Sequence, residues 1–331
     1  ARAANGVVLV QTKRAKGDQK VQVNYRGQYN VEQSTRNPEF LNAYDFAVLR
    51  NRAVDNTPGT TITKYTDAQL DQIKNHTAPN VYGDEDYMSY LDKTGYSTTH
   101  SVSVTGGNQL VCYYLSTGVA DAKGIYTGIG RTRLTYSAKL DATLAKGLVL
   151  SFSEEGSRTR SKNSSYSTLS SAYSYSPLQV YRFTNGDLAS INGGNPLINI
   201  YGLGGYIKNT SKMNTASVNL RWEVPFVKGL SAYLRGTADT YATDPNTVYP
   251  TAKVSLRQAD NFYDSQLYEI GANFLRTFSQ KHDIEGTLVA NYQRTHTQYM
   301  YGTNQDKGIF PETMGTAQKA LLTGNEFNNQ R

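Results

Sequence analysis

Side chains that carry enzyme chemistry are few in this sequence of 331 residues, and they form no recognisable constellation. The four histidines (His76, His100, His282 and His296) include no close pair and no H-E-x-x-H motif, and no serine stands in a G-x-S-x-G elbow. The single Cys112 cannot form an internal disulfide or build a zinc site alone. The sequence therefore predicts no catalytic residues and no enzyme activity.

Two other motifs have the chemistry of a binding site but lack its spacing. The acidic stretch GDED at residues 83–86 could hold Ca²⁺, but it lacks the spacing of a calcium-binding loop, and a solvated acidic loop is the simpler interpretation. The glycine groups at 128–130 and 202–205 do not complete G-x-G-x-x-G and indicate loop flexibility instead. No cofactor or metal is predicted.

The residues best suited to ligand binding are the tyrosines of a long segment at 158–211. Aromatic faces stack on sugar rings, and nearby Asn, Arg and Asp side chains can bond to hydroxyl groups. The candidate substrate-binding residues are Tyr166, Tyr173, Tyr175, Tyr181, Arg182, Tyr201 and Tyr206. A second interpretation stays open, because tyrosines also form the aromatic girdle at membrane surfaces; strand-end Tyr113, Tyr241 and Tyr292 are expected there.

The elements that must position these residues are strands, as strict alternation of apolar and polar side chains indicates. Residues 133–144 place six apolar side chains, from Leu134 to Leu144, on one face. Residues 215–224 repeat the pattern, and 230–239, 268–274 and 283–292 carry weaker copies. In a membrane barrel the opposite, polar face would line the lumen. Its predicted lumen-facing residues are Arg133, Lys139, Asp141, Arg221, Glu223 and Arg235.

Composition and length agree with a membrane β-barrel. The chain has 26 Tyr and 28 Gly but one Trp, a balance that favours strands over helices. No apolar run reaches about 18 residues, which excludes a transmembrane helix, whereas strands of about 9–11 residues suit a tilted membrane span. The net charge of +7 is scattered, with one basic cluster at 13–20 in a turn, so no nucleic-acid surface is predicted.

Connections alternate between short and long, as periplasmic turns and extracellular loops do in outer-membrane barrels. The predicted short links are 105–109, 145–147, 225–229 and 279–283, and the predicted long segments are 32–97, 121–130, 158–211, 243–264 and everything after 296. About nine strands are expected between them, near 20–31, 98–105, 109–120, 131–144, 148–158, 212–224, 230–242, 265–277 and 283–296. No closing strand is expected in the tail, so an internal fragment of a larger barrel is predicted.

Helices are predicted only in the first long segment. Residues 37–54 place apolar side chains at helical spacing, with Asn37 as the expected cap and Pro38 at the first helical position. A second helix is expected after Thr66, with Gln69 in the capping-box position.

Four ordered stretches resemble the SusC-like (SusC/RagA) TonB-dependent outer-membrane transporters of Bacteroidota. ARAANGVVLVQTKRAKG at 1–17 resembles the end of that family's plug domain, and FLNAYDFAVLRNRA at 40–53 resembles a family helix. The hairpin at 100–125 and the strands at 133–157 are also similar to the family's. After Ser161 the resemblance is one of architecture only.

The resemblance implies an all-β fold: a partial transmembrane antiparallel barrel, about nine of about 22 strands, preceded by the last strand of a plug domain. Residues 1–17 would end the plug, and 18–331 would begin the barrel, with extracellular loops at about 32–97, 158–211, 243–264 and 297–331. The implied partners are a SusD-like surface lipoprotein, the TonB-ExbB-ExbD complex through a box outside this sequence, outer-membrane lipids and an oligomeric substrate. No nucleic acid is expected.

The function that follows is energised import across the bacterial outer membrane. A glycan or oligosaccharide is the preferred substrate class, and a peptide is the alternative within the same family. A non-transporting β-rich surface or adhesin module is the alternative from another class, although such a module has no need for a plug-like segment before its first strand.

Overall fold

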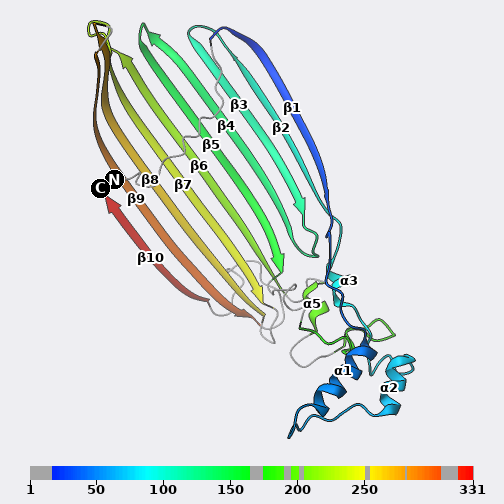
Figure 1. The fold of residues 1–331 in the computed structure, drawn as a ribbon. Coiled ribbons are helices and arrows are strands. Elements are labelled where there is room, and N and C mark those ends of the chain that lie inside the picture. Colours follow the sequence, from blue (N-terminus) through cyan, green and yellow to red (C-terminus); the bar gives the residue numbers. More distant parts are fainter. Residues whose placement is uncertain are drawn as a thin grey trace.

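The fold is a single antiparallel sheet of long strands with a small helical unit at one end (Figure 1). The structure is a computed structural model and describes residues 17–164, 174–189, 195–200, 205–249, 254–279, 282–306 and 320–330. The strands are β1 (Gln19–Glu32), β2 (Gly95–Gly107), β3 (Val111–Lys123), β4 (Gly130–Ala145), β5 (Leu148–Ser164), β6 (Tyr206–Glu223), β7 (Leu230–Tyr249), β8 (Val254–Phe278), β9 (His282–Asp306) and β10 (Ala320–Gln330). The helices are α1 (Ala43–Asp55), α2 (Asp67–Lys74), α3 (Tyr87–Leu91) and α5 (Pro196–Ile200).

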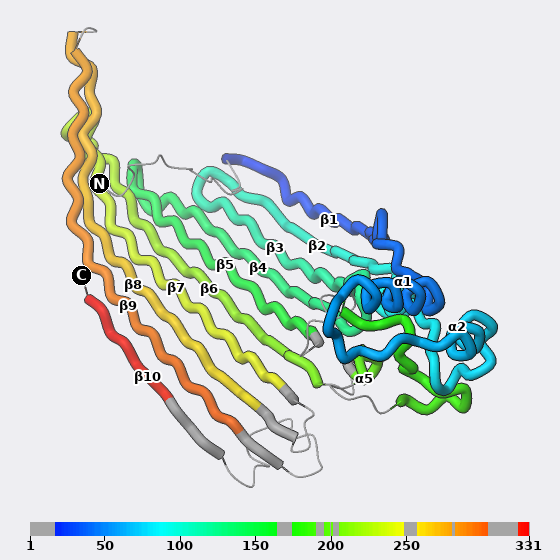
Figure 2. Tube along the Cα trace, turned by 60° about the horizontal axis from the view of Figure 1, so that its bottom comes forward, coloured from blue at the N-terminus to red at the C-terminus, as the bar shows by residue number. Residues whose placement is uncertain are grey.

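Each strand pairs with its sequence neighbours, so the sheet order runs from β1 to β10 without a crossover. Short turns join β2 to β3, β4 to β5, β6 to β7 and β8 to β9, and all of them lie at the end of the sheet away from the helices (Figure 1). The predicted short links are confirmed. Figure 2 shows that the β8–β9 hairpin projects beyond its neighbours at this end.

The register gives the sheet one apolar and one polar face. The apolar side chains of β4 share a face with Leu115 of β3, Phe152 of β5 and Leu220 of β6, because directly paired residues point the same way. Many apolar side chains on this face are exposed, such as Ile270 at 61% and Leu288 at 76%. The opposite face is polar, and Lys139 near its centre is only 5% exposed.

All nine predicted strands are present. The prediction that no strand follows them near the end of the chain was wrong. β10 pairs with β9 from Ala320↔Asn304 to Gln330↔Arg294. Its sequence, ALLTGNEFNNQ, has no clear alternation of apolar and polar residues, so periodicity could not reveal it. β10 forms instead by pairing with the unpaired N–H and C=O groups along the edge of β9.

Several predicted long segments are shorter than expected because strands continue into them. The segments expected as loops at 243–264 and 297–331 are largely strand, since β7 reaches Tyr249, β8 begins at Val254 and β9 reaches Asp306. β5 and β6 likewise extend into 158–211. Cross-strand hydrogen bonds can continue where both faces are wet and polar, and hydrophobic alternation stops there. The predicted strand segment at residues 6–10 lies outside the described residues.

The second predicted helix is confirmed, and the first begins later than expected. Thr66 caps α2, with Gln69 completing a capping box. α1 begins at Ala43, capped by the Asn42 side chain, which accepts a hydrogen bond of 2.8 Å from the Asp45 N–H. The expected cap Asn37 instead donates to the Asp92 carboxylate at 2.6 Å, holding the segment before α1 in an extended path.

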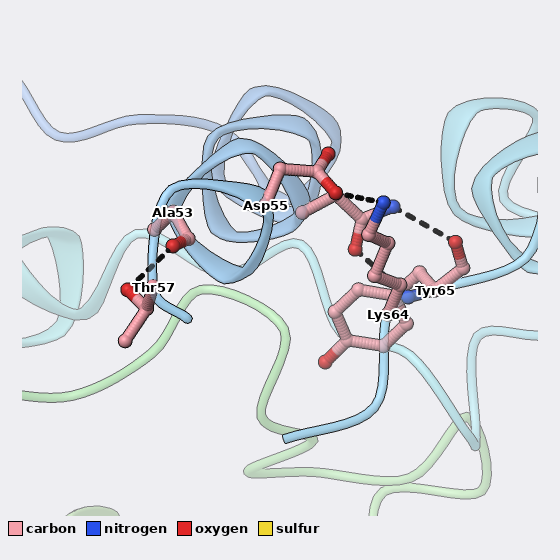
Figure 3. Close-up of polar contacts among 6 residues, drawn as sticks. Ala53, Asp55, Thr57, Lys64 and Tyr65 are labelled. Atoms are coloured by element: carbon pink, nitrogen blue, oxygen red, sulfur yellow. Dashed lines mark hydrogen bonds and ion pairs between the residues drawn. The ribbon is translucent and has the colours of Figure 1, made fainter. Parts of the chain in front are cut away.

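The end of α1 is tied to the segment that leads to α2. Figure 3 shows Asp55 paired with Lys64 and the Thr57 hydroxyl donating to the Ala53 carbonyl. Nearby, the Asn51 side-chain amide bonds both the N–H and the C=O of Tyr65 at 2.8 Å, as a strand partner would. The bonds from Asn51 supply the hydrogen-bond partners of the Tyr65 backbone and fix the end of this segment against α1. Among the described residues, no helix is both long enough and apolar enough to cross a membrane.

Candidate functional site

Three tyrosines form the core of the helical unit. The rings of Tyr87, Tyr175 and Tyr181 lie 5.3 to 5.9 Å apart between centroids and pack against Leu91 and Leu197. Tyr181 is fully buried, and its hydroxyl donates to the Ser176 carbonyl at 3.0 Å. Burial raises the pKa of both Tyr87 and Tyr181 well above the ordinary tyrosine value. The rings therefore join segments that are about ninety residues apart in the sequence.

Backbone pairing brings the same two segments into direct contact. The Gly83 N–H donates to the Leu178 carbonyl at 2.9 Å, and a Cβ at Gly83 would lie 2.4 Å from the Gln179 carbonyl oxygen. Only glycine fits this approach without a shift of the backbone. The buried Asn195 side chain then bonds the carbonyls of Tyr181 and Ala189, which links the segment to α5.

A cleft of about 660 Å³ lies between the segment before α1 and this tyrosine core. One side has the apolar side chains of Phe40, Leu41 and Phe46, and Phe40 is 41% exposed. Carboxylates border the cleft as well. Its lining includes Glu39, Asp84, Glu85, Asp86, Tyr87, Tyr175, Pro177 and Tyr181, and no Lys, Arg or His is among its described lining residues. The cleft is thus aromatic and acidic.

The acidic stretch at 83–86 has structural roles in the helical unit. Asp84 accepts the Ala43 N–H at 2.7 Å at the start of α1. Asp86 caps α3 by accepting the Met88 N–H at 2.9 Å. Glu85 accepts a hydrogen bond from the Tyr90 hydroxyl. The carboxylates therefore serve helix starts and a tyrosine, and no group of three metal-ligating side chains gathers within the described ranges.

The predicted substrate-binding tyrosines have different environments. Tyr175 and Tyr181 line the cleft, but Tyr181 is enclosed by the core and holds the loop together rather than facing solvent. Arg182 follows the core in an isolated bridge with Leu188, and Tyr206 begins β6 on the apolar face. Tyr166, Tyr173 and Tyr201 lie outside the described residues. Contact of this set with a substrate stays a prediction.

Sequence reasoning missed the aromatic wall of the cleft. Phe40 was expected within the first helix, whereas it lies in the segment before α1. The GDED motif signalled the carboxylates, but it was interpreted as a solvated loop and not as part of a cleft. No local signal predicts that residues near 40 and 85 meet those near 177, because tertiary packing alone brings them together.

All six predicted lumen residues lie on the polar face. Asp141, Ser151, Asn219, Arg235 and Glu269 form one row across β4 to β8, and Arg221 pairs with Tyr233 in the next row toward the short turns. Arg133, Lys139 and Glu223 point the same way by strand alternation. Their role in lining a channel stays a prediction.

Ion pairs hold these charges on the polar face. Lys139, only 5% exposed, pairs with Glu155 at 2.5 Å and lies 5.7 Å from the centre of the Tyr114 ring. Arg235 approaches Glu269 at 3.7 Å. Arg221 and Glu223 are 3.4 Å apart. Paired charges of this kind suit a wet interior and would be costly against lipid.

A cavity of about 830 Å³ lies on the polar face near the short turns, lined by Arg221, Glu223, Tyr233 and Arg235 among others. The side-chain oxygen of Asn219 in this cavity is buried without a protein hydrogen-bond partner in the structure, as is that of Asn261 on the same face. Buried polar atoms are normally hydrogen-bonded, so this face has free capacity to bond water or another polar surface.

Comparisons with known proteins find one curated relative by sequence and several solved structures by fold. No family model matches the chain. The TonB-dependent receptor SusC of Bacteroides thetaiotaomicron is 29% identical over 140 residues, which is 42% of this chain and 12% of SusC. The RagAB peptide importer in its open-open state superposes with a TM-score of 0.76 over 99% of the chain, at 16% identity. Its closed-closed state gives a TM-score of 0.74 over the whole chain, also at 16% identity.

The chain is SusC/RagA-like. The sequence match carries the resemblance to SusC, and the structural match, at such low identity, shows the fold. This SusC/RagA-like chain spans 12% of SusC and 41% of the matched RagAB chain. Its antiparallel sheet has the fold of the matched part of the RagAB importer, and the matched proteins are named as a TonB-dependent receptor and as a peptide importer.

Proposed function

We propose that this chain forms part of a TonB-dependent outer-membrane importer for an oligomeric nutrient, with a glycan as the substrate class. The observation that carries the proposal is the two-faced sheet: a lipid-compatible apolar face, and a polar face whose charges are paired and whose buried polar atoms have spare bonding capacity. Such a polar face suits an aqueous lumen that is occupied by a plug.

The arrangement of domains and partners follows from the same proposal. Residues 1–17 end the plug domain, and 18–331 belong to the barrel. The helical unit lies at the end of the sheet with the long loops (Figure 1), which is the extracellular end if short turns face the periplasm. A SusD-like lipoprotein would cover that end, and the TonB complex would act on the plug from the other.

The cleft beside α1 supports a neutral sugar chain as substrate. Sugar rings present C–H faces that stack on aromatic side chains, and carboxylates accept hydrogen bonds from hydroxyl groups. Phe40 offers an exposed ring, and Glu39 and Glu85 lie beside it. Because the described lining is acidic, an anionic glycan would be repelled.

The test is binding of a neutral oligosaccharide series to the purified whole protein with its lipoprotein, measured by calorimetry. Phe40→Ala should weaken binding about three- to tenfold through the loss of stacking. Phe183→Ala is the matched control, because Phe183 is similarly exposed but does not line the cleft. Equal effects of the two variants, or none, would contradict a sugar site in this cleft.

A peptide remains the alternative substrate because the same carboxylates could bind amino groups. Charge distinguishes the two. Glu39→Gln should leave neutral sugar binding nearly unchanged, whereas it should weaken a cationic peptide and reduce the salt dependence of its binding. Tight, salt-dependent binding of a lysine-rich peptide, with no binding of sugars, would favour the peptide importer.

A further inference from the structure

A cluster of basic side chains lies on the apolar face of the sheet, at and beyond the end of the apolar band that is nearer the long loops. We propose that this cluster binds the phosphorylated headgroup of a glycolipid in the outer leaflet and so anchors the barrel at a fixed height. This proposal concerns the lipid-facing surface and does not depend on whether the protein imports a glycan or a peptide.

The cluster follows the register across β3 to β6. Lys123, Gly130, Lys162 and Lys208 form one row of directly paired residues, with Tyr96 at its β2 end. The next row holds Arg160, with Asp121 on β3 and Asp244 on β7 in the same row, and the row after it holds Arg158 paired with Lys212. Strand alternation puts all of them on the face of Leu134 and Tyr136. The six basic residues Lys123, Arg158, Arg160, Lys162, Lys208 and Lys212 are all exposed.

Like charges are directly paired across two strands at two places in the cluster. Lys162 stands opposite Lys208, and Arg158 stands opposite Lys212. Like charges directly opposite each other destabilise a sheet. Lys212 is compensated by Asp244 at 3.5 Å, and the ammonium groups of Lys162 and Lys208 lie 5.4 and 4.7 Å from the Tyr206 ring centre. Sharing one ring keeps both ammonium groups close together.

A groove runs through the cluster at Gly130. Its volume is about 380 Å³, and Lys123, Arg160, Lys162 and Lys208 line it. Asp121 is the only acid among the described lining residues, and it accepts a hydrogen bond from Thr132 at 2.7 Å. Gly130 leaves space between Lys123 and Lys162, because a Cβ there would meet only the Ala122 carbonyl oxygen at 3.5 Å.

The position of the groove selects a lipid headgroup. Thr132 and Gly130 follow directly beyond Leu134, the last apolar residue of the band on β4, at the end of the sheet with the long loops. A group bound there lies level with the headgroups of the outer leaflet. Basic side chains at this level attract anionic headgroups with about a fivefold gain in affinity for each lysine.

The experiment measures binding of monophosphoryl lipid A to the whole protein in phosphatidylcholine nanodiscs, by native mass spectrometry. The variant K123Q/K162Q/K208Q should weaken binding about a hundredfold. The matched control K64Q/K74Q/K93Q removes the same charge from the helical unit, away from the groove, and should bind normally. The variant K123R/K162R/K208R should also bind.

A second variant tests the groove without changing its charge. Gly130→Leu should fill the groove, because its φ is ordinary and its only close neighbour is at a normal contact distance. Loss of lipid A binding in this variant, with the barrel still folded, supports a shaped site. Normal binding in both K123Q/K162Q/K208Q and Gly130→Leu would overturn the proposal.

Two further measurements distinguish lipid A from other ligands of the groove. Inorganic phosphate that binds as tightly as lipid A, and competes with it, would overturn a lipid site in favour of a general anion site. Retained lipid A but lost lipoprotein in K123Q/K162Q/K208Q would overturn it in favour of a protein interface.

Discussion

Replacing Leu140 by arginine tests which face of the sheet meets lipid. Leu140 lies on β4 among the outward apolar side chains that run from Leu134 to Leu144. A strand tilted by about 40° rises roughly 2.6 Å along the membrane normal per residue, so these ten steps span about 26 Å. That distance matches the apolar band of about 25 Å in outer-membrane barrels. Leu140 is therefore near the membrane midplane, and Leu134 and Leu144 are at the two edges of the apolar band.

The expected cost of Leu140→Arg is about 2–4 kcal/mol of folding free energy, because a guanidinium at the midplane loses its water. Leu144→Arg makes the same change on the same strand and face at the edge of the apolar band, away from the basic cluster, so it should cost only about 0–1 kcal/mol. The difference corresponds to roughly one to three orders of magnitude in the unfolding equilibrium. Lys139, at nearly the same depth, is tolerated because it points to the polar face and pairs with Glu155.

The assay is denaturant unfolding of the whole protein in phosphatidylcholine vesicles, followed by the gel mobility shift of the folded barrel. Leu140→Ala serves as a control for lost side-chain contacts. Equal destabilisation by arginine at both positions, or none at Leu140, would refute the assignment of the apolar face to lipid.

Three further predictions concern the helical unit. Gly83→Ala should destabilise it by about 1–3 kcal/mol, because the new Cβ would lie 2.4 Å from the Gln179 carbonyl oxygen; limited proteolysis would show faster cleavage of the unit, and unchanged cleavage would contradict this close packing. Thr66→Ala should remove the capping box of α2 at a cost of about 1 kcal/mol, measured by hydrogen exchange of that helix, while Thr66→Ser should keep most of the protection. Burial raises the pKa of Tyr87 and Tyr181 in the folded state. Their contribution to the folding free energy is therefore complete below pH about 10, the pKa of tyrosine in the unfolded chain, and above that pH it falls by up to about 1.4 kcal/mol per pH unit for each phenol. Tyrosinate absorbance should then rise together with loss of the unit, and a normal titration near pH 10 without unfolding would disprove it.

The sequence was sufficient to predict the strands inside the membrane because each one is two-faced. Leu134 to Leu144 alternate with polar residues, and lipid on one side and water on the other enforce that pattern. The capping box of Thr66 and Gln69 is equally local, since both side chains bond backbone groups within one turn. Alternation also grouped Arg133, Lys139 and Arg235 with the other polar residues on one face before any register was known.

Features outside the membrane could not be predicted in this way. β10 and the ends of β7, β8 and β9 have no apolar side to mark them, and only pairing with a neighbouring edge decides that they are strand. The start of α1 depends on the bonds of Asn42 and on Asp92 drawing Asn37 away.

The sequence by itself determined the two-faced strands, their order and the alternation of short and long connections, because these depend on neighbours in the chain. Only the tertiary structure decided that Tyr181 is enclosed while Phe40 is open to a cleft, since their segments meet through the Gly83 contact. Register likewise brought Lys162 opposite Lys208. Side-chain contacts between distant segments are set by packing, which no local pattern encodes.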